Sequence, residues 1–174
     1  MKLHRRNSVM DPNVRVVDNF LDTYPFDRLY SVMMGDEIPW YYNKYTTREG
    51  DGMFKYTHRF DKLIPGTDKY SPFVSMIEPI LVKLNAVGYH RINANNLHRT
   101  RFFNQNTGFH TDGYDCPKTA IFYINTCNGY TKFKKGSKVM SVANRMVFFP
   151  SEMEHAGFTC TDEERRVIIN FNYE

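Results

Sequence analysis

The feature that most constrains the fold of this chain is a short segment, residues 109–113, together with one distant histidine. Within the segment, His110 and Asp112 stand two positions apart. On a strand, residues i and i+2 point to the same side, so an imidazole nitrogen and a carboxylate oxygen can converge on one point. His155 follows 45 residues after His110. A fold that brings these three side chains to one face, with open positions opposite, would hold a transition metal.

Three further stretches accompany these residues. Residues 106–112 read Asn-Thr-Gly-Phe-His-Thr-Asp, residues 122–125 read Phe-Tyr-Ile-Asn, and residues 146–150 read Met-Val-Phe-Phe-Pro. A charged turn then leads into a strand pattern that starts with arginine. In this order, residues 96–173 resemble the iron- and 2-oxoglutarate-dependent dioxygenases, and most of all their prolyl 4-hydroxylase-like branch. The sequence departs from that branch at Tyr130, which stands where a second glycine is usual.

The resemblance implies an α+β, mainly β fold. This fold is a double-stranded β-helix, a jelly-roll or cupin-like barrel of two antiparallel sheets, with N-terminal helices packed on its outside. The order of apolar patterns, helices first and strands later, agrees with an α+β chain. Aromatic residues make up 16% of the chain and suit strands around a lined cavity. Residues 95–97 and 100–103 are predicted as two separate strands.

Two helices are predicted from their end signals. The first begins at a cap provided by Asp22 or Thr23, carries apolar residues at helical spacing and ends at Gly35. The second begins with Ser71 as cap and Pro72 in the first helical position.

Length and composition predict one globular domain, residues 1–174. The polar residues 1–12 are expected to be flexible, and the resemblance implies a catalytic core at about 91–174. Hydrophobic residues make up 41% and charged residues 24%, which excludes a disordered chain. Three cysteines without C-x-x-C spacing argue against a disulfide framework or zinc knuckle and predict reduced thiols. No apolar run reaches the roughly 18 residues of a membrane span, and none follows the basic N-terminus as in a signal peptide. We therefore expect a cytoplasmic protein without a membrane partner.

The resemblance also implies cofactors and their ligands. Fe(II) would be bound by His110, Asp112 and His155. The far carboxylate of 2-oxoglutarate would meet an arginine, and Tyr123 stands where the branch offers a tyrosine hydroxyl to the same group. O2 is the second cosubstrate, ascorbate is a candidate stimulant, and the products are hydroxylated substrate, succinate and CO2.

Arg165 and Arg166 compete for the carboxylate, because adjacent strand residues face opposite ways. A buried carboxylate favours arginine, which offers charge-assisted and often bidentate hydrogen bonds. With Arg166 inward, the inner wall would be partly polar and would include Asn170. In related sites a polar residue follows the arginine by four positions, as Asn170 follows Arg166. We therefore predict Arg166 and Asn170 as 2-oxoglutarate-binding residues and a surface position for Arg165.

The class of substrate is left open by the sequence. A prolyl or other side chain of a peptide or protein is favoured, because the core motifs resemble the prolyl-hydroxylase branch and the aromatic run 39–45 could line a peptide groove. A nucleic-acid or nucleobase substrate is the alternative. The net charge of +4, without a block of like charges, does not favour it. Two further alternatives are a small-molecule substrate and a barrel that binds a partner without catalysis. The sequence does not determine the oligomeric state.

Overall fold

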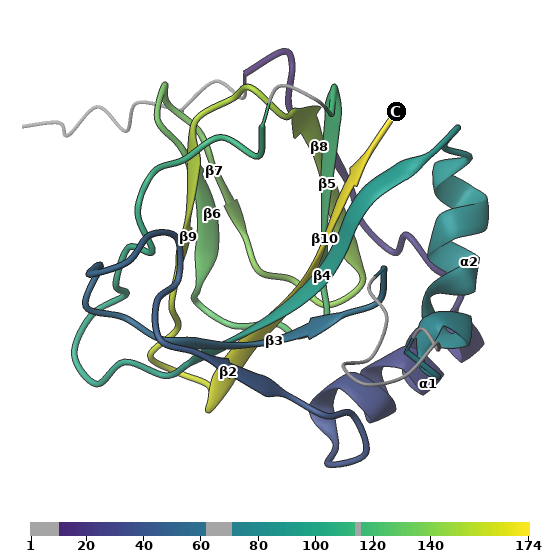
Figure 1. The fold of residues 1–174 in the computed structure, drawn as a ribbon, viewed down its shortest axis with the longest axis horizontal. Helices are drawn as coiled ribbons and strands as arrows, with labels where there is room; N and C mark the ends of the chain where they lie inside the picture. The colour runs from purple at the N-terminus through teal and green to yellow at the C-terminus, as the bar shows by residue number, and fades with distance from the viewer. Residues whose placement is uncertain (1–10, 62–70, 114–115) are drawn as a thin grey trace, which may run out of the picture.

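The computed structural model describes residues 11–61, 71–113 and 116–174, so the first ten of the residues 1–12 that were predicted to be flexible lie outside the described residues. Two antiparallel sheets face each other, and two helices pack against the outer face of the larger sheet (Figure 1). The larger sheet has the strand order β1-β8-β5-β10-β4-β3-β2, and the smaller has the order β7-β6-β9. The fold is therefore mainly β, as predicted, with the two sheets of a jelly roll and the helices outside. Within the described ranges, no helix is long and apolar enough to span a bilayer.

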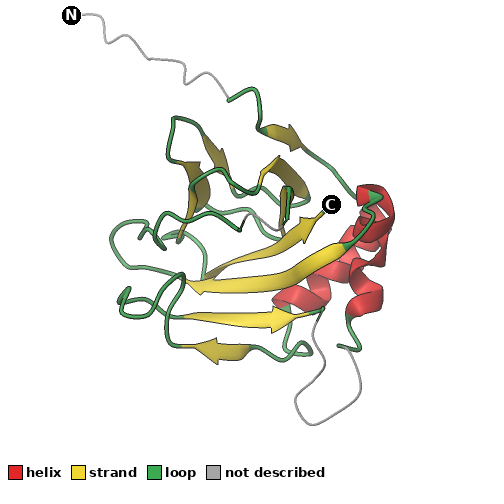
Figure 2. Ribbon diagram, turned by 45° about the horizontal axis from the view of Figure 1, so that its top comes forward, coloured by secondary structure: helices red, strands yellow, loops and turns green. Residues whose placement is uncertain are grey.

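Both helices lie in the first half of the chain, and Figure 2 shows them gathered on one side of the strands. The elements in chain order are β1 (Arg15–Val17), α1 (Thr23–Met34), β2 (Tyr41–Asn43), β3 (Lys55–Arg59), α2 (Val74–Leu84), β4 (Tyr89–His98), β5 (Lys118–Tyr123), β6 (Tyr130–Phe133), β7 (Lys138–Met140), β8 (Arg145–Pro150), β9 (His155–Phe158) and β10 (Arg165–Tyr173).

The first helix, α1, follows its predicted pattern. Asp22 is the N-cap residue, and Gly35 is the residue after the helix. The Gly35 N–H bonds the Ser31 carbonyl at 2.9 Å, and a Cβ at this position would lie only 2.6 Å from the same oxygen. Leu29 and Met33, one turn apart, are fully buried. The helix therefore ends where only a glycine fits and packs its apolar face on the large sheet.

The second helix, α2, begins two residues later than predicted. Its N-cap residue is Phe73, not Ser71. The Ser71 hydroxyl lies 2.7 Å from Nε2 of His58 and accepts the Phe73 N–H at 3.2 Å. The hydroxyl therefore fixes a turn ahead of the helix, and Pro72 lies in this turn instead of the first helical position.

One long strand replaces the two predicted at 95–97 and 100–103. β4 runs without interruption through the first range, paired with β10 on one side and β3 on the other. Residues 100–103 are not a strand. The Thr100 hydroxyl bonds the Phe103 carbonyl at 2.6 Å, which turns the chain, and Phe103 is exposed. The apolar pattern was misleading there because no strand among the described residues pairs with this segment.

β10 lies between β5 and β4 and separates two packed layers. One set of alternate residues contacts the helices, and the set comprises Val167, Ile169 and Phe171. The other set faces the small sheet, and it comprises Arg166, Ile168, Asn170 and Asn172. The alternation of β10 thus gives the barrel an apolar outside, covered by helices, and a partly polar inside.

Candidate active site

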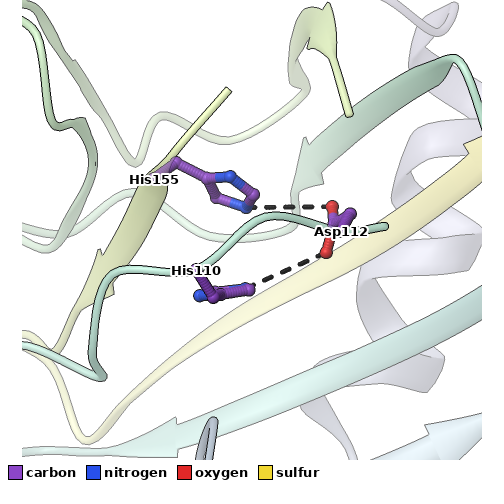
Figure 3. Close-up of side chains that lie close together, drawn as sticks. All are labelled: His110, Asp112 and His155. Carbon is purple, nitrogen blue, oxygen red and sulfur yellow. Dashed lines mark ion pairs between the residues drawn. The ribbon is translucent and has the colours of Figure 1, made fainter. Parts of the chain in front are cut away.

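The two histidines of the predicted triad are held side by side by backbone pairing. The His110 N–H bonds the His155 carbonyl at 3.0 Å, and the His155 N–H bonds the His110 carbonyl at 2.9 Å. The Asp112 N–H bonds the Ser151 carbonyl at 3.0 Å. His155 begins β9, whereas His110 and Asp112 belong to an extended loop and not to a named strand. The pairing nevertheless brings the three side chains around one point (Figure 3).

The side chains present a metal-binding donor set. His110 Nε2 lies 3.9 Å from Asp112 Oδ1, and His155 Nε2 lies 3.8 Å from Asp112 Oδ2. His110 Nδ1 lies 3.1 Å from the Gly108 carbonyl. His155 Nδ1 lies 2.9 Å from the Met153 carbonyl. Donation of Nδ1–H to these carbonyls leaves both Nε2 lone pairs directed at the shared point, and two histidines with one carboxylate fit Fe(II).

Burial and charge keep these groups in their metal-binding forms. Burial lowers the pKa of His155, which favours the neutral ring, although the Asp112 charge opposes this shift. Burial alone would raise the pKa of Asp112, but His155 and Arg91 outweigh this effect and hold the pKa below its usual value. Arg91 donates to Oδ1 at 2.8 Å, while Thr119 and Asn172 donate to Oδ2 at 3.0 and 3.1 Å. A carboxylate has about four lone-pair sites, so room for a metal remains.

Arg166 is a fully buried cation with most of its hydrogen-bonding capacity unused. Its side chain is 0% exposed, and Nη2 donates to the Thr131 hydroxyl at 3.1 Å. Nε and Nη1 have no partner among the described residues. A Cβ at Gly129 would lie 2.6 Å from Arg166 Cδ, so this glycine gives the arginine its space. A buried charge is costly unless it is paired, and the site therefore fits a carboxylate.

The other two predicted cosubstrate residues differ in their placement. Asn170 lines the cavity, and its Oδ1 has no described partner. Tyr123 is fully buried beneath Arg166, whose guanidinium carbon lies 5.4 Å from the ring centre, and its hydroxyl donates to Thr131 at 2.8 Å. The Thr131 hydroxyl accepts from both side chains and lines the cavity. Its own proton is then left to donate to a ligand.

Arg165 lies on the opposite side of β10. It is half-buried and donates from Nη2 to the Met34 carbonyl at the end of α1. The solvated surface position predicted for Arg165 is therefore wrong in part, because the helix end gives the guanidinium a specific acceptor.

Two cavities that share several lining residues border the triad. The inner cavity is lined by His110, His155 and Arg166, and the outer cavity by His110, Asp112 and Arg91. The outer cavity is the larger, 580 Å³ against 60 Å³ for the inner. The metal site therefore lies between the cavity that contains the Arg166 guanidinium and the larger outer cavity.

Several solved structures share this architecture. An oxidoreductase of the 2OG-Fe(II) oxygenase family from Burkholderia pseudomallei superposes with a TM-score of 0.67 at 12% identity, over 92% of this chain and 85% of that one. A prolyl hydroxylase from Trichoplax adhaerens, in complex with a peptide fragment of the hypoxia inducible factor oxygen degradation domain, gives 0.65 at 11%, over 92% and 83%. A Pseudomonas putida prolyl-4-hydroxylase gives 0.52 at 13%, over 93% and 92%. This chain has the 2OG-Fe(II) oxygenase fold.

Sequence comparison by itself does not detect this relation, because no protein-family model and no curated protein matches the chain. The similarity in structure confirms the predicted double-stranded β-helix. Within the oxygenase fold, the sequence did not predict the contributions of Arg91, Thr119 and Thr131 to the site. Arg91 and Thr119 lie on strands without a motif. Thr131 follows Tyr130, the position at which the sequence differs from the prolyl-hydroxylase branch. That difference was the only hint in the sequence that residues 127–133 contribute to the site.

The carboxylate of Asp51 holds together a loop, residues 46–53, that lies beside the cavities of this oxygenase fold. Asp51 Oδ2 accepts the backbone N–H groups of Thr46 and Thr47 at 2.9 and 2.8 Å, and Oδ1 accepts that of Met53 at 3.0 Å. The Thr46 and Thr47 hydroxyls in turn bond the Thr107 carbonyl at 3.0 and 2.6 Å. Burial would raise the pKa of Asp51, but the hydrogen bonds from the Thr47, Thr46 and Met53 backbone N–H groups and from the Thr46 hydroxyl outweigh it and lower the pKa far below its usual value. The ionised form therefore ties the loop to the barrel.

We expect acid to weaken this loop selectively. Because the folded-state pKa is lowered, the stabilisation is complete above the unfolded pKa of about 3.9 and is lost as the pH falls toward the folded value. Asp51→Asn should lower the melting temperature at neutral pH. Below about pH 4, the melting temperature of this variant should fall less steeply with decreasing pH than that of wild type. Asp36→Asn, at an exposed position, is the matched control. Equal pH profiles for wild type and Asp51→Asn in differential scanning fluorimetry would contradict the assignment.

Proposed function

We propose that this chain is a non-haem Fe(II)- and 2-oxoglutarate-dependent dioxygenase, acting as a single domain with its catalytic core at about 91–174. The observation that carries the proposal is that Arg166, a buried cation without a described anionic partner, shares one cavity with His110 and His155. A metal site alone has many uses. A metal site together with a buried arginine fits a cosubstrate that chelates the metal at one end and presents a carboxylate at the other.

Each residue then has a defined task. Bound Fe(II) with 2-oxoglutarate and O2 supplies the oxidation of a substrate C–H bond, with release of succinate and CO2. His110, Asp112 and His155 would hold the metal on one face and leave the opposite positions open. Arg166 and the Thr131 hydroxyl would orient the far carboxylate.

For the substrate we propose a prolyl or other side chain of a peptide or protein. The prolyl hydroxylase from Trichoplax adhaerens, which has this fold, was solved with a peptide. Tyr42 packs with Phe54 and Tyr56 on the face of β2 and β3 that is opposite to the cavity-lining side chains of Asn43, Lys55 and Thr57. Tyr45 lines the cavity itself. An exposed aromatic side chain in this position suits an extended, proline-containing segment.

The function is tested by succinate release. Purified protein with Fe(II), ascorbate, O2 and 2-oxoglutarate should release succinate, and proline-containing peptides should increase the rate and gain about 16 Da, the mass of the oxygen atom delivered with the cofactor chemistry. Stimulation by single-stranded DNA or RNA instead, with base oxidation, would move the assignment to nucleic-acid substrates. Stimulation by neither pool would point to a small molecule. Failure to bind or consume 2-oxoglutarate would contradict the enzymatic assignment.

A further inference from the structure

Lys55 is a cation without a described anionic partner at the boundary between the two cavities. It is the first residue of β3, and its side chain lines both cavities, as do those of His110 and Asn170. Among the described residues, no carboxylate lies within ion-pair distance of its ammonium group. Burial, followed by repulsion from Arg91, lowers the pKa of Lys55 to about 8, although the charges of Asp51 and Asp112 oppose the change. The ammonium is therefore partly desolvated and has no direct ion-pair partner among the described residues.

The other two cations of the outer cavity are neutralised within the chain. Arg91 pairs with Asp112 at 2.8 Å. Arg59 pairs through two of its nitrogens with Asp61. Of the cations in the described lining, Lys55 is thus the one whose charge is available to a bound molecule.

The wall of the outer cavity is mainly polar in its described part, although the ring of Tyr45 belongs to it. It contains four amide side chains (Asn43, Asn93, Asn95 and Asn170) together with threonine hydroxyls, and no aliphatic side chain. Such a wall can hydrogen-bond a polar molecule at many points and offers little apolar contact. A divalent metal bound at the triad would add further positive charge nearby, which favours an anionic ligand in the cavity. The cavity is therefore suited to a polar molecule with a negative charge.

We propose that Lys55 binds a carboxylate of the primary substrate and so positions the substrate beside the triad. This inference rests on the proposed function and narrows its substrate class. The carboxylate can belong to a small acid or to an acidic side chain near the modified residue of a peptide. Lys55 is in this view a specificity-determining residue and not a metal or cosubstrate ligand.

The test measures binding to the full chain loaded with Ni(II) and 2-oxoglutarate. One arm compares N-acetyl amino acids with their amides. The other compares capped proline-containing peptides that carry glutamate with the same peptides that carry glutamine. Calorimetry is performed on wild type, Lys55→Met, Lys55→Arg and Lys132→Met, a control that removes an exposed charge from β6.

In at least one pair, we expect the compound with the carboxylate to bind at least about tenfold more tightly than the matching amide. This is the size of effect expected for one hydrogen bond to a charged group. Lys55→Met should remove the difference, whereas Lys55→Arg and Lys132→Met should keep it, and the responding arm identifies the source of the carboxylate. If no acid binds more tightly than its amide, the inference is overturned. It is also overturned if Lys55→Met loses 2-oxoglutarate binding, because Lys55 would then serve the cosubstrate. Failure of wild type to bind 2-oxoglutarate at all would instead reject the proposed function.

Discussion

Arg166→Ala should weaken 2-oxoglutarate binding by about 2–5 kcal/mol, the scale for removing one partner of a buried charged pair. The guanidinium is fully buried, and Nε and Nη1 have no described partner until an anion arrives. Since its charge lacks a described counter-charge in the free protein, the same substitution should leave the melting temperature of the ligand-free protein unchanged or raise it. Calorimetric titration of Ni(II)-loaded protein with 2-oxoglutarate measures the first effect, and scanning calorimetry the second.

Arg165→Ala is the matched control, because it removes the same side chain from the other face of β10. It should leave 2-oxoglutarate affinity unchanged and cost on the order of 1 kcal/mol of stability, since it loses the bond to the Met34 carbonyl. Arg166→Lys should bind with intermediate affinity, because it keeps a charge but loses the guanidinium fork. The reverse pattern, with affinity lost in Arg165→Ala and kept in Arg166→Ala, would show that the wrong arginine has been assigned.

The second large effect concerns the metal. We expect one Fe(II) per chain, replaceable by Mn(II), Co(II) or Ni(II), and no turnover in His110→Ala or His155→Ala. Loss of a direct ligand should weaken metal binding by more than the roughly 10–100-fold typical of outer-shell partners. Circular dichroism should remain that of wild type, because the backbone pairing between the two histidines does not need the imidazoles.

Glu154→Gln is the control for the metal prediction. Glu154 is next to His155 in the chain but is exposed and pairs with Lys134 at 2.6 Å. Its removal should leave metal binding intact. Undiminished Fe(II) binding by the double variant His110→Ala/His155→Ala, measured by titration, would show that the ligand assignment is wrong.

The parts of the site that could be predicted from the sequence are those set by local periodicity. Two-residue spacing puts His110 and Asp112 on one side of an extended segment, whether or not the segment joins a sheet. The same alternation along β10 makes Arg165 and Arg166 mutually exclusive as inner residues, and it groups Asn170 with Arg166. The end signals of α1 are equally local, because a cap and a terminal glycine act within one turn.

The local signals failed where a distant partner competed for the same group. The Ser71 hydroxyl was expected to cap a helix. It instead hydrogen-bonds the His58 ring and the Phe73 N–H in a turn before the helix. The apolar residues at 100–103 had the composition of a strand, but no strand lies beside them in the described structure. A backbone or hydroxyl group forms its hydrogen bond with whichever partner the fold places nearest. The sequence of one segment does not specify which other segment will lie beside it.

The sequence by itself thus determined the fold class, the candidate metal ligands and the pair of arginines from which one must be inward. Only the tertiary structure decided that Arg166 is the buried one, that Arg91 holds Asp112, and that Lys55 reaches the same cavity. These side chains come from β10, β4 and β3, which the antiparallel pairing of the large sheet places side by side. The register of that pairing depends on the burial of all the strands together, so no single segment encodes it.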